Sequence, residues 1–278
     1  MSQVFSFNRW LLLVGKHWSE NRKRYLLSLI AVAGLLIIWF VFTILVERPY
    51  PMDKSMQAGT YFTGLFLVGC LFGSMLFADM AGGPKAIHYL AVPASALEKL
   101  LTALLFGVVL FFISYTIIFY LVDIPMMKIA NDLAADWWKE NRSGETYTFR
   151  EVANVFWVEQ ARGWDPLVLL LTIYFPVQSA FILGSVYFAR YSFIKTAISV
   201  LVIFLLLLLF VAQVLVALLP PGGYFESITS YRILGNQEDL RIVRLPGWID
   251  NTVVILFKYA FTPVFWVATY FRIKEKEV

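Results

Sequence analysis

The sequence predicts an all-α polytopic membrane protein with six transmembrane helices, an N-terminal interfacial helix and two sizeable extracytoplasmic loops. Of its 278 residues, 60% are hydrophobic and only 15% are charged. Soluble domains average about 45–50% apolar and about 25% charged residues, so a soluble fold could not bury this much apolar surface. We therefore expect a single transmembrane domain over residues 1–278, with the lipid bilayer as its main partner.

Residues 1–24 form the predicted interfacial helix on the cytoplasmic side. Its apolar and aromatic face recurs at helical spacing and comprises Phe7, Trp10, Leu11, Val14 and Trp18. Such a helix lies in the membrane plane with this face in the acyl boundary. We expect interface anchors at Trp10 and Trp18 and at the basic run Arg22, Lys23 and Arg24. The alternative is that the segment simply extends the first span into the cytoplasm.

Six apolar runs come next in the chain, each close to the roughly 20 residues that a bilayer requires. They lie at about 25–45, 60–79, 99–122, 166–189, 195–219 and 252–271. Each must be helical, because a lone strand in lipid would leave its backbone unpaired. The second run contains Gly64, Gly69 and Gly73, which allow neighbouring helices to approach closely.

The distribution of basic residues predicts that both termini are cytoplasmic, in the inner (plasma) membrane of a bacterial cell. The expected cytoplasmic segments hold 12 Lys or Arg, and the longer outer loops, about 46–59, 123–165 and 220–251, hold 10. Short segments count most in this bias. An inverted topology is the alternative. Within the first large outer loop we predict two amphipathic helices, at about 126–141 and 149–161.

The sequence lacks the motifs that most chemical functions require. The sequence contains no phosphate loop, no H-E-x-x-H and no G-x-S-x-G. Its two histidines, His17 and His88, lie far apart without a companion cysteine pattern, so we predict no metal site, no cofactor and no catalytic residue. The charge of +4 belongs to the ends and loops and indicates no nucleic acid.

Two ionisable residues need separate interpretation. Lys258 lies inside the last run, where its ammonium is expected to snorkel to the outer interface. A substrate-binding role is the alternative, since ionisable groups within spans are functional candidates. Asp123 falls at the end of the third run, where we expect its carboxylate to reach water.

The loop at 80–98 carries the strongest local signals. Gly82, Gly83 and Pro84 break the preceding helix, and Pro93 ends any further helix before the next span. Ser95 and Glu98 then form a capping box, in which each side chain accepts from the other residue's backbone amide. The chain therefore holds a short, firmly capped segment between two spans.

The run AVPASALEK, residues 91–99, resembles the loop after the second span in the permease subunit of a bacterial type-2 ABC exporter. In that family the loop often reads Leu-Pro-x-Ser-Arg-x-Glu and continues through a lysine. The matching residues here are Val92, Pro93, Ser95, Glu98 and Lys99. Ala96 departs from the family pattern, in which arginine is common.

This resemblance implies a transport subunit, not an enzyme, that pairs with a second permease subunit, identical in the simplest case. It also implies a separate ATP-binding subunit that docks on the loop through Lys85, His88, Pro93, Ser95 and Glu98. Closure of the ATPase would push on the loop and on the N-terminal helix. The simpler interpretations are that His88 is a solvated loop residue and that Ser95 and Glu98 only cap the third span.

Two other classes of function remain open. A non-transporting membrane scaffold or assembly subunit of an envelope complex would fit the aromatic outer loops and the lack of a polar stripe through the spans. An integral membrane enzyme that acts on lipid would need an acid–base constellation, and the sequence shows none. The sequence does not identify a substrate or the direction of transport.

Overall fold

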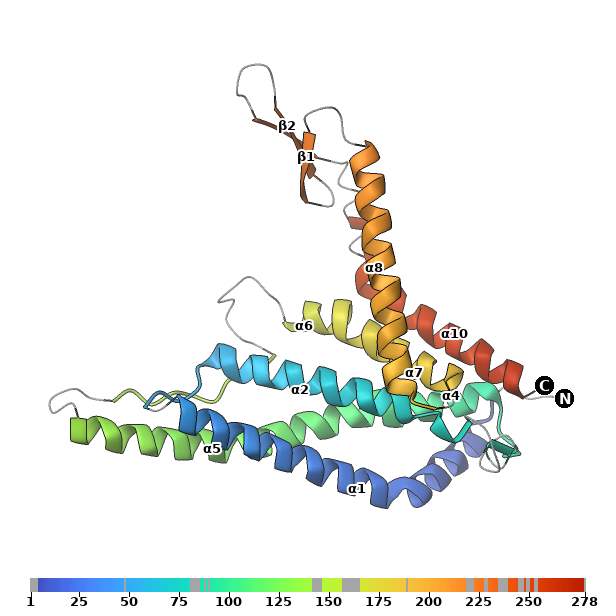
Figure 1. Cartoon of the computed structure of the whole chain (residues 1–278). Coiled ribbons are helices and arrows are strands. Elements are labelled where there is room, and N and C mark those ends of the chain that lie inside the picture. The colour runs from blue at the N-terminus through green and yellow to red at the C-terminus, as the bar shows by residue number, and fades with distance from the viewer. Residues whose placement is uncertain are drawn as a thin grey trace.

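The computed structural model describes residues 5–47, 49–80, 86–87, 89, 91–141, 147–156, 166–188, 190–218, 223–227, 230–234, 240–244, 248, 251–252 and 255–277. The chain is mainly helical, and Figure 1 shows both termini at one end of the molecule, here called the terminal end. The opposite end, where α1 stops and α5 stops, is called the far end.

The helices follow one another in a simple order. The α-helices are α1 (Phe7–Val46), α2 (Lys54–Met75), α4 (Ala96–Leu104), α5 (Phe111–Asn141), α6 (Pro166–Leu169), α7 (Phe175–Tyr187), α8 (Ser192–Leu218) and α10 (Phe261–Lys276). A short 3₁₀ turn, η1 (Ala78–Met80), follows α2. The described residues also include three π-helical segments, η2 (Leu105–Leu110), η3 (Leu170–Tyr174) and η4 (Leu256–Ala260), which lead directly into α5, α7 and α10.

Five helical stretches within the described residues are long and apolar enough to cross a membrane. They are Phe7–Val46, Lys54–Met75, Ala96–Asn141, Pro166–Tyr187 and Ser192–Gln213. The expected class, a helical membrane protein, is therefore confirmed. The sixth predicted run, 252–271, falls on η4 and α10, which are not among the five.

Two details of the segments predicted to be outer loops differ from expectation. Residues 220–251 add a small antiparallel sheet to the helical architecture, formed by β1 (Gly223–Ser227), β2 (Ser230–Leu234) and β3 (Leu240–Arg244). Tyr231 pairs with Val243 at its centre. Aromatic and β-branched residues favour such strands. The predicted helix at 149–161 is wrong over residues 149–156, which are not helical.

The core forms where α2 packs between α5 and α7. Tyr61, Leu65, Tyr115, Phe119 and Tyr174 are almost fully buried in one apolar cluster. A Cβ added to Gly64 would clash with the Tyr115 hydroxyl, and one added to Gly69 would lie 2.6 Å from the Tyr174 hydroxyl. The small residues of the second run therefore allow close helix packing, as predicted.

Helix α8 runs across the direction of α1, α2 and α5 (Figure 1). It contacts α7 and α2, and Thr196 in its first turns is buried. Most of the residues from there to Gln213 expose their side chains. The packing of Thr196 against Gly184 of α7 leaves no room for a Cβ on that glycine.

At the far end, the extended segment 147–156 is held by side chains rather than by secondary structure. Asn131 of α5 donates to the Arg150 carbonyl at 2.8 Å and accepts from the Arg150 amide at 3.0 Å. Gln57 of α2 accepts from the Ala153 amide at 2.8 Å. These bonds satisfy backbone groups that a helix would otherwise pair internally, so the segment is stable in extended form.

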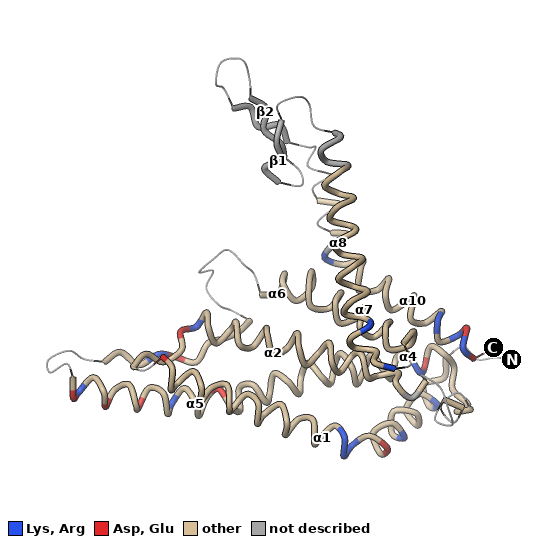
Figure 2. The backbone as a smooth tube through the Cα atoms, in the orientation of Figure 1, with Lys and Arg blue, Asp and Glu red and all other residues tan. Residues whose placement is uncertain are grey.

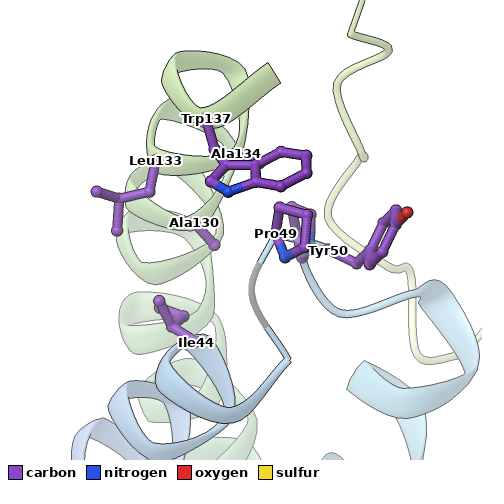
Figure 3. A pocket seen from close by; sticks show the side chains of 8 residues that line it. Ile44, Pro49, Tyr50, Ala130, Leu133, Ala134 and Trp137 are labelled. Carbon is purple, nitrogen blue, oxygen red and sulfur yellow. The ribbon is translucent and has the colours of Figure 1, made fainter. Parts of the chain in front are cut away.

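The charge at this end is exposed and paired locally. Lys54 donates to the Glu151 carboxylate at 2.9 Å, and this bond holds the pKa of Glu151 below its ordinary value. A hollow of about 70 Å³ lies nearby between the end of α1, residues 49–51 and α5. Figure 3 shows Trp137 of α5 projecting toward Pro49 across this hollow.

We predict that Gly184→Leu destabilises the packing of α7 against α8. The added side chain must displace Thr196, and overpacking of this kind costs about 1–3 kcal/mol. Thermal unfolding of the detergent-solubilised protein should show a lower midpoint. The matched control is Gly59→Leu, because a Cβ at Gly59 meets nothing within 4 Å. Equal midpoints for the two variants would refute the packing argument.

We also predict that Asn131→Leu releases residues 147–156. The substitution leaves the amide and carbonyl of Arg150 without their partner, at a cost of about 1–3 kcal/mol. Amide hydrogen exchange at Arg150 should accelerate. Asn141→Leu is the control, since Asn141 is exposed and bonds within its own helix, to the Trp137 carbonyl. Unchanged exchange in Asn131→Leu would contradict the role assigned to this side chain.

Candidate functional site

The predicted capping box is present at the start of α4. The Glu98 amide donates to Ser95 Oγ at 3.3 Å, and the Ser95 amide donates to Glu98 Oε2 at 3.0 Å. The helix begins at Ala96, three residues before the span boundary predicted at 99. The local sequence therefore fixes where the chain re-enters a helix after the loop.

Glu98 also binds the start of the chain, 89 residues away. Arg9 Nε donates to Glu98 Oε2 at 2.7 Å, and Arg9 Nη2 donates to Oε1 at 2.7 Å. The Ser6 amide donates to Oε1 at 2.8 Å. The Glu98 side chain is 0% exposed and that of Arg9 is 36% exposed. With the Ser95 amide included, the carboxylate accepts four hydrogen bonds, two of them in the bidentate geometry that gives the strongest ion pairs.

The C-terminal end of α10 joins the same region. Lys99 is buried, with 2% of its side chain exposed, and its Nζ lies 2.8 Å from Glu277 Oε1. Lys276 donates to the Val186 carbonyl of α7 at 2.6 Å. Burial lowers the pKa of Lys276, and the nearby Arg272 cation lowers it further.

These contacts define a Glu98 cluster, made of Ser6, Arg9, Ser95, Glu98, Lys99 and Glu277. It connects the start of α1, the start of α4 and the end of α10. Figure 2 shows charged residues gathered at this terminal end and along the far end, with few between them. The cluster is therefore an ionic junction between three segments that are distant in sequence, in which Glu98 and Lys99 are buried and Arg9 and Glu277 are partly exposed.

The residues predicted to dock a partner fall into three groups. Lys85 and His88 lie outside the described residues. Pro93 is exposed and Ser95 is half-buried. Glu98 is fully buried, so it offers no surface to another protein and can act only by holding the loop in place.

Among the described residues of the loop, the exposed ones are apolar. The side chain of Ile87 is 72% exposed, and Ala91 and Pro93 are also exposed. We call Ile87, Ala91 and Pro93 the loop face. The sequence pattern predicts Ser95 and Glu98 as docking residues, but Ser95 is half-buried and Glu98 is fully buried.

The predicted interface anchors lie on α1, which continues through residue 24 without a break. Trp18 is 48% exposed, Arg22, Lys23 and Arg24 lie beyond it on the same helix, and Trp10 is half-buried. The boundary predicted at residues 24 and 25 is therefore not a helix end. Instead α1 bends in its N-terminal part (Figure 1).

Two side-chain bonds to the backbone lie in the N-terminal part of α1, where the helix bends. Ser19 Oγ donates to the Lys16 carbonyl at 2.8 Å, and Asn21 donates to the His17 carbonyl at 3.1 Å. Such bonds compete for helix carbonyls and bend helices. Residues 7–24 are thus helical and continuous with the first span, and their interfacial location stays a prediction.

The spans carry buried polar groups that the sequence interpretation missed. Tyr61 and Thr116 share a hydrogen bond of 2.9 Å, and Gln178 donates to the Gly107 carbonyl of η2 at 2.9 Å. A π-helical turn leaves carbonyls without their usual partner, and Gln178 supplies one. The signal was available, because Gln178 is a lone amide in an apolar run.

Asp123 corrects a specific expectation. Its side chain is fully buried rather than open to water, and neither carboxylate oxygen has a hydrogen-bond partner among the described residues. The helix continues past the predicted span end at 122 to Asn141, which removes the access that a span end would give. Within the part of the chain that the structure describes, no three His, Cys, Asp or Glu side chains gather where a metal ion could bind.

We predict that a Glu98 series separates the cap from the ion pair. Glu98→Gln keeps an acceptor for the Ser95 amide but loses the charge that binds Arg9, so it should lower the unfolding midpoint less than Glu98→Ala. Removing the whole side chain should cost about 2 kcal/mol, from the cap and the charged hydrogen bonds together.

The test is thermal unfolding of both variants with and without Arg9→Gln. In Glu98→Ala, Arg9→Gln should have a much smaller further effect than in the unchanged protein, because the hydrogen bonds between Arg9 and Glu98 are already lost. Additive losses of stability would show that Arg9 and Glu98 act independently. Lys139→Gln, which removes an exposed cation paired with Asp136, is the charge-matched control.

Comparison with protein-family models, with curated proteins and with solved structures finds no match to this chain. The function is therefore inferred from the residues and contacts described above.

Proposed function

We propose that this chain is the membrane-spanning subunit of an ATP-driven exporter of the bacterial type-2 ABC kind. A separate ATPase subunit would dock on the loop after the second span and supply the energy. The observation that carries the proposal is the junction of Arg9 and Ser6 with Glu98, which couples the N-terminal helix to that loop.

A docked partner would apply its force at the loop face. A partner that presses on Ile87, Ala91 and Pro93 moves a segment that ends at the capped start of α4. Because the Glu98 carboxylate is buried and accepts four hydrogen bonds, α1 and α4 cannot separate without breaking charge-assisted bonds. A push on the loop would therefore move the first and third spans together.

The remaining parts of the proposal concern arrangement in the membrane. We infer six spans, with α10 and its preceding π-helical turn as the sixth. Both termini and the Glu98 cluster would face the cytoplasm of a bacterial cell with the chain in its inner membrane, in keeping with the excess of basic residues there. A second permease subunit, identical in the simplest case, would complete the pathway.

A scaffold or assembly role is the second candidate, and the far end favours it. The continuous helix Ala96–Asn141 has 46 residues, which corresponds to about 69 Å. The hydrocarbon core is only about 30 Å thick, so this helix extends well beyond it. With residues 147–156 bound to it, the far end offers a built surface to an envelope protein.

We predict that Ile87→Glu weakens recovery of an ATPase subunit when the tagged protein is purified from its own cells. Docking would bury the new carboxylate at the loop face, and burying a charge without a partner is unfavourable. Phe149→Glu is the matched control, because Phe149 is 60% exposed but belongs to the far end. The ATPase is recognised in the eluate by its phosphate-loop sequence.

The two candidates give opposite results. The exporter proposal requires the ATPase with the unchanged protein and with Phe149→Glu, and much less with Ile87→Glu. The scaffold role requires no ATPase in any sample and an envelope protein that Phe149→Glu removes. A complex whose conformation never responds to ATP would also overturn the exporter proposal.

A further inference from the structure

A groove of about 520 Å³ lies between the bent α1, α2 and the π-helical segment η2. Trp18, Tyr25, Leu29, Val68, Phe72 and Phe106 are among its lining residues. Ligand sites typically have volumes of about 300–1,000 Å³ and mostly apolar walls with few polar groups. This groove has the size and character of such a site.

The groove has the Tyr25 hydroxyl near the bend, and its walls are mostly apolar farther along α1. His17 Nε2 and the Tyr25 hydroxyl are 2.5 Å apart, and the His17 ring lies 4.7 Å from that of Phe106, centre to centre. The end farther along α1, here called the deeper end, is lined by Val32 and Val68 together with Phe111 and Ser114. A molecule that fits this gradient has a polar head at the bend and an apolar chain beyond it.

Positive charge lies at the polar end. Arg22 follows Trp18 by four residues and precedes Leu26 by four, and both of these line the groove, so Arg22 shares their helix face. Figure 2 shows basic residues where α1 bends. Basic groups beside a span attract anionic lipid headgroups.

The depth of the groove matches one leaflet of a bilayer. From Arg22 to Val32 the helix rises by ten residues, or about 15 Å. The hydrocarbon core is about 30 Å thick, so one leaflet contributes about half of that. An acyl chain with its phosphate beside Arg22 would therefore reach the deeper end of the groove.

We propose that this groove binds one acyl chain of an anionic phospholipid, with the lipid phosphate held at Arg22. The lipid occupies the space between α1 and η2 and is distinct from the annular lipid on exposed helix faces. The proposal does not depend on the transport function. It assigns the basic run a specific ligand in addition to a general affinity for the membrane surface.

The first test fills the groove. Gly15 lines it, and a Cβ added there meets nothing within 4 Å, so Gly15→Trp places a ring in the groove without disturbing the helix. Gly34→Trp is the matched control, because Gly34 is equally open on α1 but does not line the groove. A single symmetric peak in size-exclusion chromatography and an unchanged unfolding midpoint establish that both variants are folded.

The measurement is native mass spectrometry after exchange into mixed micelles with phosphatidylglycerol or phosphatidylcholine. We expect one phosphatidylglycerol per chain in the unchanged protein and in Gly34→Trp. In Gly15→Trp the affinity should fall by at least about tenfold, since each buried methylene contributes appreciably to binding. Phosphatidylcholine should bind much more weakly in every case.

The second test addresses the headgroup. Arg22→Gln should weaken phosphatidylglycerol binding by about fivefold. Lys23→Gln should weaken it less, because Lys23 lies about 100° further around the helix. Glycerol 3-phosphate, which carries the charge without the chain, should not compete.

Several results would overturn the proposal. Equal binding of the two lipids would remove the role of charge, and competition by glycerol 3-phosphate would indicate an anion site without a chain. Unchanged lipid binding in Gly15→Trp would place the lipid elsewhere. If Gly15→Trp instead abolished a dimer and left lipid binding intact, a second copy of the chain would be the occupant of the groove.

Discussion

The terminal end of the molecule depends on the hydrogen bonds and the ion pair of the buried Glu98 carboxylate. This carboxylate caps α4 and receives the Ser6 amide and the forked side chain of Arg9. A carboxylate removed from water is costly unless donors surround it, and here it accepts four hydrogen bonds. Each segment that contributes a donor is thereby fixed relative to the others. Lys99 and Glu277 extend the same constraint to the end of α10.

The fold could be predicted from the sequence where the information is local. Apolar runs of sufficient length indicated the spans, and the spacing of Ser95 and Glu98 indicated the cap that the structure contains. The partner of Glu98 could not be found in this way, because Arg9 lies 89 residues away and carries no local sign of the pairing. Local capping and long-range pairing use the same carboxylate, and only the first leaves a sequence pattern.

Prediction of the conformation from the sequence fails where long-range contacts decide it and where composition hides the local pattern. The sequence predicts a helix over residues 149–156, yet Asn131 and Gln57 bind their backbone in extended form. The strands around Tyr231 and Val243 are short and do not alternate strictly between polar and apolar residues, so periodicity did not reveal them. Asp123 was assigned to water because its helix was expected to end with the apolar run. The capping box was thus predictable in position, but the exposure of the side chains around it was not.

The π-helical segments also change how the spans should be compared with other sequences. Each π turn adds about one residue to a helix, and one residue corresponds to about 100° of rotation. In the third span, the face of α4 that packs near Lys99 and the face of α5 that presents Tyr115 therefore do not belong to one helical wheel. A related chain that lacked the extra residue in η2 would align with a single-residue gap inside a membrane span. Such a gap would mark a repacked interior rather than an alignment error.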